Sequence, residues 1–480
     1  MLTWASPFNI CCFLDNQGYQ AAPLRQSPHT PGQASATPPS ALSTQLIAPP
    51  TPSLGPATPP PVFECLLAAG AADAFTANPG QAFASLKTWA AGQKDWLFGH
   101  FAYDLATETE PAHSGRPPGQ PPAQPSGPTP APLDPNPPAH QPAQPPGTPA
   151  DPIGFPALFF FCPETVITLQ LDNILIGSLG PDPETIWHAI QAAVPREPTP
   201  QPPIVFEPRF TREEYLETIT ALRRHILRGD CYEINFCQEF FTRPAALDPW
   251  AAWHALSKAS PNPFSAFYRL NDRYLLCASP ERFLKRTGPT LLSQPIKGTA
   301  PRVRGDAAAD FSTGLALAES TKDQAENVMV VDLVRNDLSR ICKPGTVRVS
   351  ELFGIYAFPQ VYQMISAITG ELLPGLHWTD AVRATFPMGS MTGAPKNNVV
   401  RLIAQYERSP RGLFSGALGY VTPDGDFDFN VVIRSLLYRK DTGYLSYQVG
   451  SGITYNSDPE AEYEECLLKA QGIRKALGII

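Results

Sequence analysis

The sequence has no long hydrophobic run, although hydrophobic residues make up 43% of its 480 positions. A membrane-spanning helix needs about 20 consecutive apolar residues, and no segment approaches that length. The first residues, MLTWASPFNICCF, also lack the basic start and the small-residue cleavage site of a secretory signal. We therefore expect a cytoplasmic protein without a membrane partner.

Basic residues are too few to outweigh the acidic ones. The chain has 36 Lys and Arg against 44 Asp and Glu, which gives a net charge of −8. This balance argues against a nucleic acid or an acidic membrane as the partner.

The cysteine patterns of disulfide frameworks and metal sites are missing as well. The nine cysteines include no C-x-x-C pair, and none lies at metal-ligand spacing from histidines. We expect them to be reduced and to act as small, buried hydrophobic residues.

Proline is abundant, with 57 residues, but its distribution is uneven. Residues 21–62 and 109–153 are rich in proline and hold few large apolar side chains, so we predict two disordered insertions. They interrupt an amino-terminal region, residues 1–195, in which strand-like apolar patterns recur. Those patterns cover residues 1–20, 96–103, 157–161 and 165–171.

A second region, residues 205–480, carries the candidate chemistry. A capping box, Thr211-x-x-Glu214, begins its first predicted helix. Two more helices are predicted over residues 320–342 and from Asp458 onward, where a proline follows the cap residue. Strand-like segments are predicted at residues 232–236, 264–268 and 274–278.

A single lysine is prominent in the segment QPIKGTAPR, residues 294–302. Lys297 lies between a strand-like approach and a Gly-Thr turn, and Pro295 and Pro301 stiffen its flanks. A lysine in a confined, partly apolar site has a lowered pKa and can act as a nucleophile. Most lysines beside such a turn are solvated instead, so the neighbours of Lys297 decide between the two interpretations.

Glu281 follows the strand-like residues 274–278 and precedes Lys297 by sixteen positions, across a predicted hairpin. We therefore expect the carboxylate and the amine on neighbouring strands. They would either face one cavity or form a surface ion pair.

Two helix faces are acidic. Asp323 and Glu326 are three residues apart and share one face of their helix, and Glu462, Glu465 and Lys469 share one face of the last helix. Each face alone is typical of a solvated surface. If the faces met, the four carboxylates would repel one another unless a cation lay between them, and oxygen-only ligands suit Mg²⁺.

Two segments between these helices are suited to binding an anion. Residues 426–438 alternate as one strand, which would place three polar side chains on the same side, Asp428, Asn430 and Arg434. Arg434 would then reach a carboxylate as a two-pronged donor. The run Gly450-Ser451-Gly452 follows a strand and predicts a tight turn whose free N–H groups form an anion nest.

Together these segments resemble the chorismate-utilising enzymes, a family that includes anthranilate, aminodeoxychorismate, isochorismate and salicylate synthases. The resemblance runs from about residue 205 to 480, with the motifs in the family's order. They are ASPERFL (278–284), PIKGTAPR (295–302), AENVMVVDLVRNDLSR (325–340), GSMTGAPK (389–396), FSGALGY (414–420), VVIRS (431–435) and EAEYEE (460–465). The resemblance implies an α+β fold, a sandwich of two large, mainly antiparallel sheets flanked by helices, with the site in the cleft between them.

Lys297 favours one branch of the family, because anthranilate synthases carry alanine at this position. The chain is most similar to aminodeoxychorismate synthase component I, which serves para-aminobenzoate and folate synthesis. In those enzymes the lysine attacks C2 of chorismate and displaces the C4 hydroxyl. Ammonia then adds at C4 and expels the lysine, which gives 4-amino-4-deoxychorismate. Glu281 matches the family's acid beside the departing hydroxyl.

The resemblance also implies how a metal and the substrate are held. Glu326 and Glu465 match direct ligands of Mg²⁺, while Asp323 and Glu462 match residues that reach the ion through water. The residues implied to contact the substrate are Gly298, Thr299, Phe414, Arg434, Gly450, Ser451, Gly452 and Lys469. A candidate tryptophan pocket would use Pro263, Phe264 and Ser265, and residues 13–16 match its other part loosely.

Two positions depart from the family. Gln363 stands where anthranilate synthases have a histidine, so no histidine acid or base is expected there. Phe414 replaces a tyrosine of some relatives, so this side chain can pack on the substrate ring but cannot donate a hydrogen bond to it.

The chain lacks the nucleophilic cysteine of a glutamine amidotransferase, because Cys277 and Cys342 lie in unsuitable contexts. The implied partners are therefore chorismate, ammonia and a separate glutaminase subunit. Two alternatives stay open: anthranilate or isochorismate synthesis within the same family, and an inactive scaffold subunit whose proline-rich tracts bind other domains. The lysine, the acids and the arginine together favour an enzyme.

Overall fold

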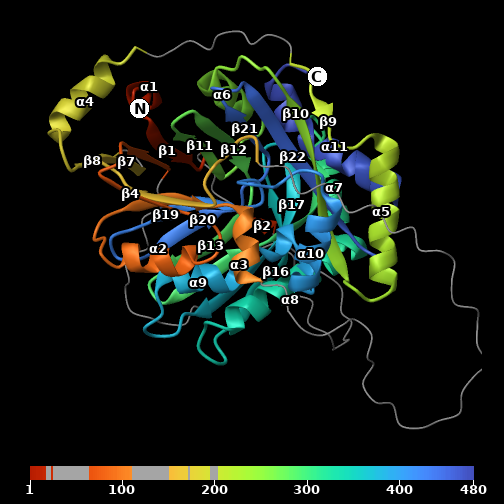
Figure 1. Ribbon diagram of the computed structural model, residues 1–480. Helices are drawn as coiled ribbons and strands as arrows, with labels where there is room; N and C mark the ends of the chain where they lie inside the picture. Colours follow the sequence, from red (N-terminus) through yellow and green to blue (C-terminus); the bar gives the residue numbers. More distant parts are fainter. Residues whose placement is uncertain (18–22, 25–63, 111–150, 171–172, 195–203, 480) are drawn as a thin grey trace, which may run out of the picture.

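The computed structural model describes residues 1–17, 23–24, 64–110, 151–170, 173–194 and 204–479. Within these residues the chain forms two eleven-stranded sheets with helices on their outer faces (Figure 1). Every strand pairing in both sheets is antiparallel. The α+β fold with two large antiparallel sheets is confirmed.

The first sheet joins strands from both ends of the chain. In spatial order its strands are β18 (Gly393–Ala394), β10 (Glu233–Thr242), β22 (Tyr444–Ile453), β21 (Ser435–Arg439), β12 (Arg273–Ser279), β11 (Phe264–Leu270), β1 (Ile10–Asp15), β3 (Cys65–Ala69), β7 (Thr165–Gln170) and β8 (Asn173–Ser178), and β9 (Glu207–Pro208) also pairs with β10. The long β10–β22 pair at one end brings residues of the candidate site together.

The second sheet is assembled in the same way. In spatial order its strands are β2 (Pro23–Leu24), β16 (Arg348–Ala357), β17 (Val361–Glu371), β14 (Thr290–Gln294), β13 (Arg282–Thr287), β20 (Phe427–Asn430), β19 (Ala417–Val421), β5 (Leu97–Phe101), β6 (Leu158–Cys162) and β4 (Asp73–Ala77), and β15 (Ile296–Pro301) also pairs with β17. Each sheet therefore contains strands from both sides of residues 195–205, so the two predicted regions share one sandwich.

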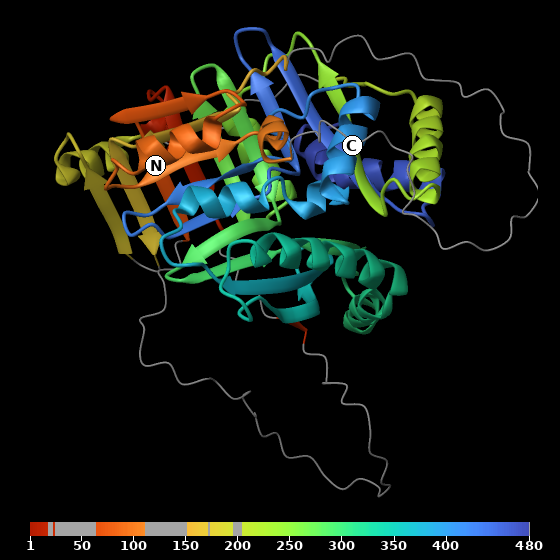
Figure 2. The ribbon, with the colours of Figure 1, turned by 60° about the horizontal axis from the view of Figure 1, so that its bottom comes forward.

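The helices cover the outer faces and one end of the sandwich. They are α1 (Leu2–Ala5), α2 (Ala82–Ala90), α3 (Ala106–Thr109), α4 (Pro183–Ala192), α5 (Arg212–Leu227), α6 (Pro249–Ala259), α7 (Ala307–Glu319), α8 (Thr321–Ser339), α9 (Trp378–Thr385), α10 (Lys396–Tyr406) and α11 (Pro459–Ala476). The teal α8 packs along β15 and β17 in Figure 2, while α11 packs on β22. No helix of the described residues has the length and apolarity needed to cross a membrane.

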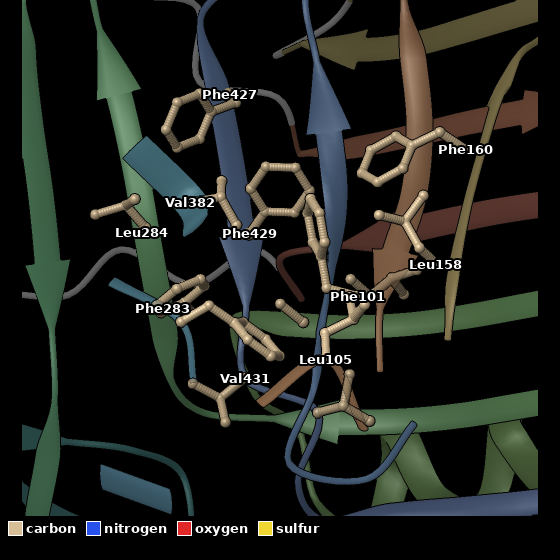
Figure 3. Close-up of a cluster of buried hydrophobic side chains, with 14 of the residues drawn as sticks. Phe101, Leu105, Leu158, Phe160, Phe283, Leu284, Val382, Phe427, Phe429 and Val431 are labelled. Atoms are coloured by element: carbon tan, nitrogen blue, oxygen red, sulfur yellow. The ribbon is translucent and has the colours of Figure 1, made fainter. Parts of the chain in front are cut away.

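The main core lies between the two sheets. Phenylalanines from neighbouring strands fill it, including Phe101, Phe160 and Phe429, none of which is exposed (Figure 3). Ring pairs such as Phe101 with Phe429 meet edge to face at 5.5 Å, a favoured aromatic geometry. A second cluster packs α5, α6, α10 and α11 against the outer face of the first sheet.

The predicted helix starts are confirmed. Thr211 and Glu214 form the reciprocal capping box of α5, Ser320 caps α8, and Asp458 caps α11 ahead of a proline. The prediction for residues 1–20 missed α1, which precedes β1.

Most of the two predicted insertions lies outside the described residues. At their edges the predicted bounds were wrong, because Pro23–Leu24 pairs with β16 and Ile153 is buried in the core. The cysteines of the described chain are all free, and eight of the nine are buried, as expected.

Candidate active site

Lys297 is a buried lysine on β15, with 9% of its side chain exposed. Its Nζ donates to Oε1 of Glu233 on β10 at 2.5 Å. Since β15 belongs to the second sheet and β10 to the first, this pair joins the two sheets at the end of the sandwich. Lys297 is therefore not one of the solvated lysines that usually flank a Gly-Thr turn.

Two glycines leave room for this pair. A Cβ on Gly452 of β22 would lie 2.7 Å from Nζ of Lys297 and 2.9 Å from Oε1 of Glu233, so a larger residue there would displace the ends of both side chains. Gly298 has φ +88°, and a Cβ there would lie 2.9 Å from Cβ of Asp323. Gly452 thus leaves the contact between Lys297 and Glu233 undisturbed, and the left-handed backbone at Gly298 requires glycine.

The charge state of Lys297 differs from the sequence-based expectation. Burial by itself lowers the pKa of the amine, but the carboxylates of Glu233, Glu326 and Glu465 outweigh it and raise the pKa above its ordinary value. The expected lowering of this pKa is wrong for the free protein, because the carboxylates come from distant segments. Lys297 therefore has to lose a proton before it can attack a carbon.

Glu281 lies between β12 and β13 with 5% of its surface exposed. Burial raises the pKa of its carboxyl to about 7, against the opposing effects of a hydrogen bond from Ser390 and the charges of Lys297 and Lys469. Oγ of Ser390 donates to Oε1 at 2.5 Å, and both residues line a cavity of about 20 Å³, room for one water molecule. Lys297 pairs with Glu233 rather than Glu281, so the surface ion pair considered from the sequence is absent from the described structure.

The acidic faces of α8 and α11 converge. The carboxylates of Glu326, Glu462, Glu465 and Asp323 all act on the amine of Lys322, raising its pKa although burial lowers it. Burial also raises the pKa of Glu326 to about 7. Among the described residues, Oε1 of Glu326 and Oε2 of Glu462 are buried without a hydrogen-bond partner.

These carboxylates are ligands of the kind that Mg²⁺ prefers, but in the described structure their oxygens do not surround one common position. No three Asp, Glu, His or Cys side chains of the described chain lie close enough together to hold a metal ion. The donors are nevertheless all oxygen, and two buried oxygens lack partners, which are conditions that a hard divalent cation would satisfy. The chemistry of these donors therefore suits Mg²⁺, although no three of them meet at one point in the described structure.

The predicted strand over residues 426–438 is wrong in its middle. β20 ends at Asn430 and β21 begins at Ser435, and Arg434 between them has φ +53°. Asp428 instead pairs with Arg282 at 2.9 Å, so it does not share a side with Arg434. Burial lowers the pKa of Arg434, although Glu465 opposes this effect, and no hydrogen bond is found for its guanidinium among the described residues.

Gly450, Ser451 and Gly452 also differ from the prediction. They form no turn but belong to the extended strand β22, opposite residues 235–237 of β10. On the other side of β22, pairing with β21 reaches only Tyr447 in the described chain, so this edge lies open near the break that holds Arg434. The hydroxyl of Ser451 lies near that of Tyr215 on α5, not at this edge. An anion would therefore meet a strand edge, not a nest.

The remaining predicted contact residues lie in different environments. Lys469 donates to the carbonyl oxygen of Gly450 at 2.8 Å and pairs with Glu465 at 2.7 Å. Phe414 is buried in the main core, and Thr299 is exposed on β15. Gln363 pairs with Thr299 across β15 and β17, and its buried Oε1 lacks a partner in the described chain.

The three residues of the candidate tryptophan pocket line a separate cavity of about 400 Å³. Pro263, Phe264 and Ser265 meet Asp15 and Asn16 there, so the structure brings the matched part and the loosely matched part together. Pro280 lines this cavity, Glu281 lines the smaller one, and Arg282 lines both.

Two polar residues of the site were missed in the sequence. The sequence pattern places Glu233 on a half-buried strand and Ser390 in a family motif, and it gives neither residue a role. A glutamate inside an apolar alternating run, Tyr232-Glu233-Ile234-Asn235-Phe236, was the available signal, because an ionised side chain on a buried strand needs a partner.

Comparison with known proteins is consistent with this geometry. Residues 134–475 match the chorismate binding enzyme family. Aminodeoxychorismate synthase component 1 of Salmonella typhimurium is 39% identical over 299 residues, which are 62% of this chain and 65% of that protein. Anthranilate synthase component 1 of Thermus thermophilus is 33% identical over 67% of this chain and 71% of its own length.

A solved structure agrees in fold. Anthranilate synthase component I of Streptococcus pneumoniae superimposes with a TM-score of 0.69 at 22% identity, over 88% of this chain and 94% of that one. The alignment with the Salmonella relative spans slightly less than two thirds of that protein's length. The match over residues 134–475 covers most of the chain and includes the buried lysine, the acids and the arginine, so the chain belongs to the chorismate binding enzyme family.

Proposed function

We propose that this protein is the chorismate-aminating component of an aminodeoxychorismate synthase, which converts chorismate and ammonia into 4-amino-4-deoxychorismate. The observation that carries the proposal is the buried amine of Lys297, placed in the same site as the protonatable carboxyl of Glu281. A nucleophile and an acid are the two groups that the exchange of a hydroxyl for an amine needs.

The reaction uses Lys297 twice. Nζ forms a bond to C2 of the ring, the two ring double bonds shift, and the C4–O bond breaks. Ammonia then forms a bond at C4, the double bonds shift back, and the C2–Nζ bond breaks. Covalent catalysis of this kind divides one difficult displacement into two easier ones.

Glu281 assists the first half of the reaction. Hydroxide is a poor leaving group, and a carboxyl whose pKa is raised to about 7 by burial still carries a proton near neutral pH. That proton moves to the departing oxygen, which leaves as water. The hydrogen bond from Ser390 fixes the orientation of the carboxyl.

The carboxylates of the substrate need cationic and polar partners. The guanidinium of Arg434 and the open edge of β22 would hold the enolpyruvyl carboxylate, since both lie beside the strand break. Glu326 and Glu465 would bind Mg²⁺ directly, with Asp323 and Glu462 behind them. When bound, this ion would hold the ring carboxylate and withdraw charge from the reacting ring.

The chain has no glutaminase nucleophile, so ammonia would come from a second, glutaminase component. The name "component 1" of similar proteins supports this assembly. The 400 Å³ cavity at Pro263, Phe264 and Ser265 would take an aromatic amino acid such as tryptophan, with Asp15 available for its ammonium group.

Product analysis tests the proposed function. Incubating the purified chain with chorismate, Mg²⁺ and ammonium should yield 4-amino-4-deoxychorismate, identified by chromatography and mass spectrometry. Because Lys297 occupies the position that is alanine in anthranilate synthases, little anthranilate should form. Accumulation of anthranilate or isochorismate would reject the assignment and favour synthesis of that compound. If chorismate is not consumed even when a competent glutaminase is present, the chain is an inactive scaffold subunit.

Mg²⁺ should stabilise the free protein. A ligand that binds only the folded state at about 100 times its Kd raises the free energy of unfolding by about 2.7 kcal/mol. Glu326→Gln should lose most of this gain in urea unfolding, because it removes one of the charges on the converging faces. Asp332→Asn is the matched control, since Asp332 is exposed on the same helix and pairs with Arg335. If Mg²⁺ stabilises the wild type, Glu326→Gln and Asp332→Asn equally, the acidic faces do not bind the ion and are ordinary solvated surface.

A further inference from the structure

The carboxylate of Glu233 is the direct partner of the proposed nucleophile. Lys297 is an ammonium in the free protein, and an ammonium has no lone pair with which to attack a carbon. Some group must therefore take a proton from Nζ. We propose that Glu233 accepts this proton when Lys297 attacks the substrate and returns it when Lys297 leaves, an inference that rests on the function proposed above.

The contact between the two side chains is short and shielded from water. Oε1 of Glu233 accepts from Nζ at 2.5 Å, and the side chains are only 2% and 9% exposed. Oε2 of Glu233 is buried and has no hydrogen-bond partner among the described residues. No other donor of the described residues binds Oε2, so Lys297 is the hydrogen-bond partner of this carboxylate.

Glycines on both neighbouring strands allow a close approach to Glu233. A Cβ on Gly393 of β18 would lie 2.0 Å from the carbonyl oxygen of Glu233, and a Cβ on Gly452 of β22 would lie 2.9 Å from its Oε1. β10 is paired with both strands at this point. Glu233 pairs with Ala394, and the next residue of β10 pairs with Ile453, so the sheet fixes the backbone that carries the proposed proton acceptor.

Other charged groups face Lys297, but each has another neighbour. On α8, Glu326 lies 3.8 Å from Lys322, and on α11, Glu465 pairs with Lys469 at 2.7 Å. Between β12 and β13, Glu281 accepts from Ser390. The only carboxylate of the described chain in hydrogen-bond contact with Nζ is that of Glu233.

The proposed step is balanced in atoms and charge. One N–H bond of the Lys297 ammonium breaks and an O–H bond forms on Glu233, which leaves a neutral amine and a neutral carboxyl. The freed electron pair forms the Nζ–C2 bond, and the electrons of the C4–O bond leave with the oxygen, which takes its proton from Glu281. When ammonia later expels the amine, Glu233 returns the proton to Nζ.

Glu233→Gln tests this assignment, because the amide has the same shape and can accept the hydrogen bond but cannot hold the proton. Chorismate is added without ammonia, the reaction is quenched at intervals, and the intact mass gives the rate at which the lysine adduct forms. At pH 7 we expect this rate to fall by about 10²- to 10⁴-fold. The deficit should shrink by about tenfold per pH unit above that, since solvent must then take the proton.

Glu233→Asp keeps the carboxylate, so it should form the adduct more slowly than the wild type but with the same pH profile. Glu239→Gln is the matched control: Glu239 lies on the same strand, is buried, and pairs with Arg209 at 2.8 Å away from Lys297. This control should keep the wild-type adduct rate and profile.

The outcomes separate the inference from the proposed function. If the wild type forms no adduct, the proposed function fails and the inference with it. If the wild type forms the adduct and Glu233→Gln does so equally fast or faster at pH 7, the inference alone fails. Glu233 would then serve only to hold the ammonium by its charge.

Discussion

Replacing Lys297 with methionine is expected to lower the amination of chorismate by at least about 10³-fold, equivalent to about 4 kcal/mol of transition-state stabilisation. Methionine has nearly the length of lysine but no amine, so the bond to C2 cannot form. The mass of the quenched protein should lack the adduct of chorismate less one water that the wild type shows. Product formation and intact mass measured on the same samples provide the check.

Loss of folding must be separated from loss of the nucleophile in this experiment. Lys297→Met leaves the buried carboxylate of Glu233 unpaired, and an unpaired buried charge is strongly destabilising. The double variant Lys297→Met/Glu233→Gln removes both charges and should recover the wild-type melting temperature while staying inactive. If the double variant makes 4-amino-4-deoxychorismate at the wild-type rate, covalent catalysis by Lys297 is refuted.

Glu281→Gln is expected to lower turnover by about 10²- to 10⁴-fold, because the amide cannot protonate the departing hydroxyl. In the wild type, burial raises the pKa of Glu281 to about 7, so turnover should decline as the pH rises through this value and the acid is lost. Ser390→Ala removes a hydrogen bond that lowers this pKa, so the decline should move to higher pH. The pH dependence of turnover for the three proteins checks the assignment, and an unmoved decline in Ser390→Ala would contradict it.

The same carboxyl affects stability with a defined sign. Its pKa rises from an ordinary 4.5 to about 7 on folding, so between these values the folded state holds a proton that the unfolded state has released. The free energy of unfolding therefore falls as the pH rises through this window, by up to about 3 kcal/mol. Glu281→Gln should remove this loss and unfold at higher urea than the wild type at pH 8. If Glu281→Gln is more stable than the wild type but inactive, the carboxyl of Glu281 lowers stability and is needed for the reaction.

Much of the site could be predicted from local sequence patterns. Capping residues and helical spacing placed Glu326 on one face of α8 and Glu465 on one face of α11. The hairpin predicted between Glu281 and Lys297 is formed by β13 and β14, although the expected neighbouring strands were wrong, because Lys297 lies on β15, which pairs with β17. These features depend on residues close in sequence, whose geometry is set by backbone periodicity.

Predictions that needed knowledge of distant neighbours were less successful. The alternation over residues 426–438 continues in the sequence, yet the chain breaks at Arg434, where it passes from the second sheet to the first. The pattern at Gly450 and Gly452 predicts a turn, whereas in the structure Cys237, Glu233 and Lys297 approach these glycines closely from other segments. A sequence pattern cannot distinguish a glycine needed for a turn from one needed for close approach.

The sequence by itself determined the family resemblance, the amphipathic helices, the acidic faces and the candidate roles of Lys297 and Glu281. Only the tertiary structure decided the charge state of Lys297, because its carboxylate partner Glu233 lies 64 residues earlier and in the other sheet. Electrostatic interactions act through space, so the pKa of a buried group depends on which strands and helices the fold brings around it. Local periodicity carries no information about those distances.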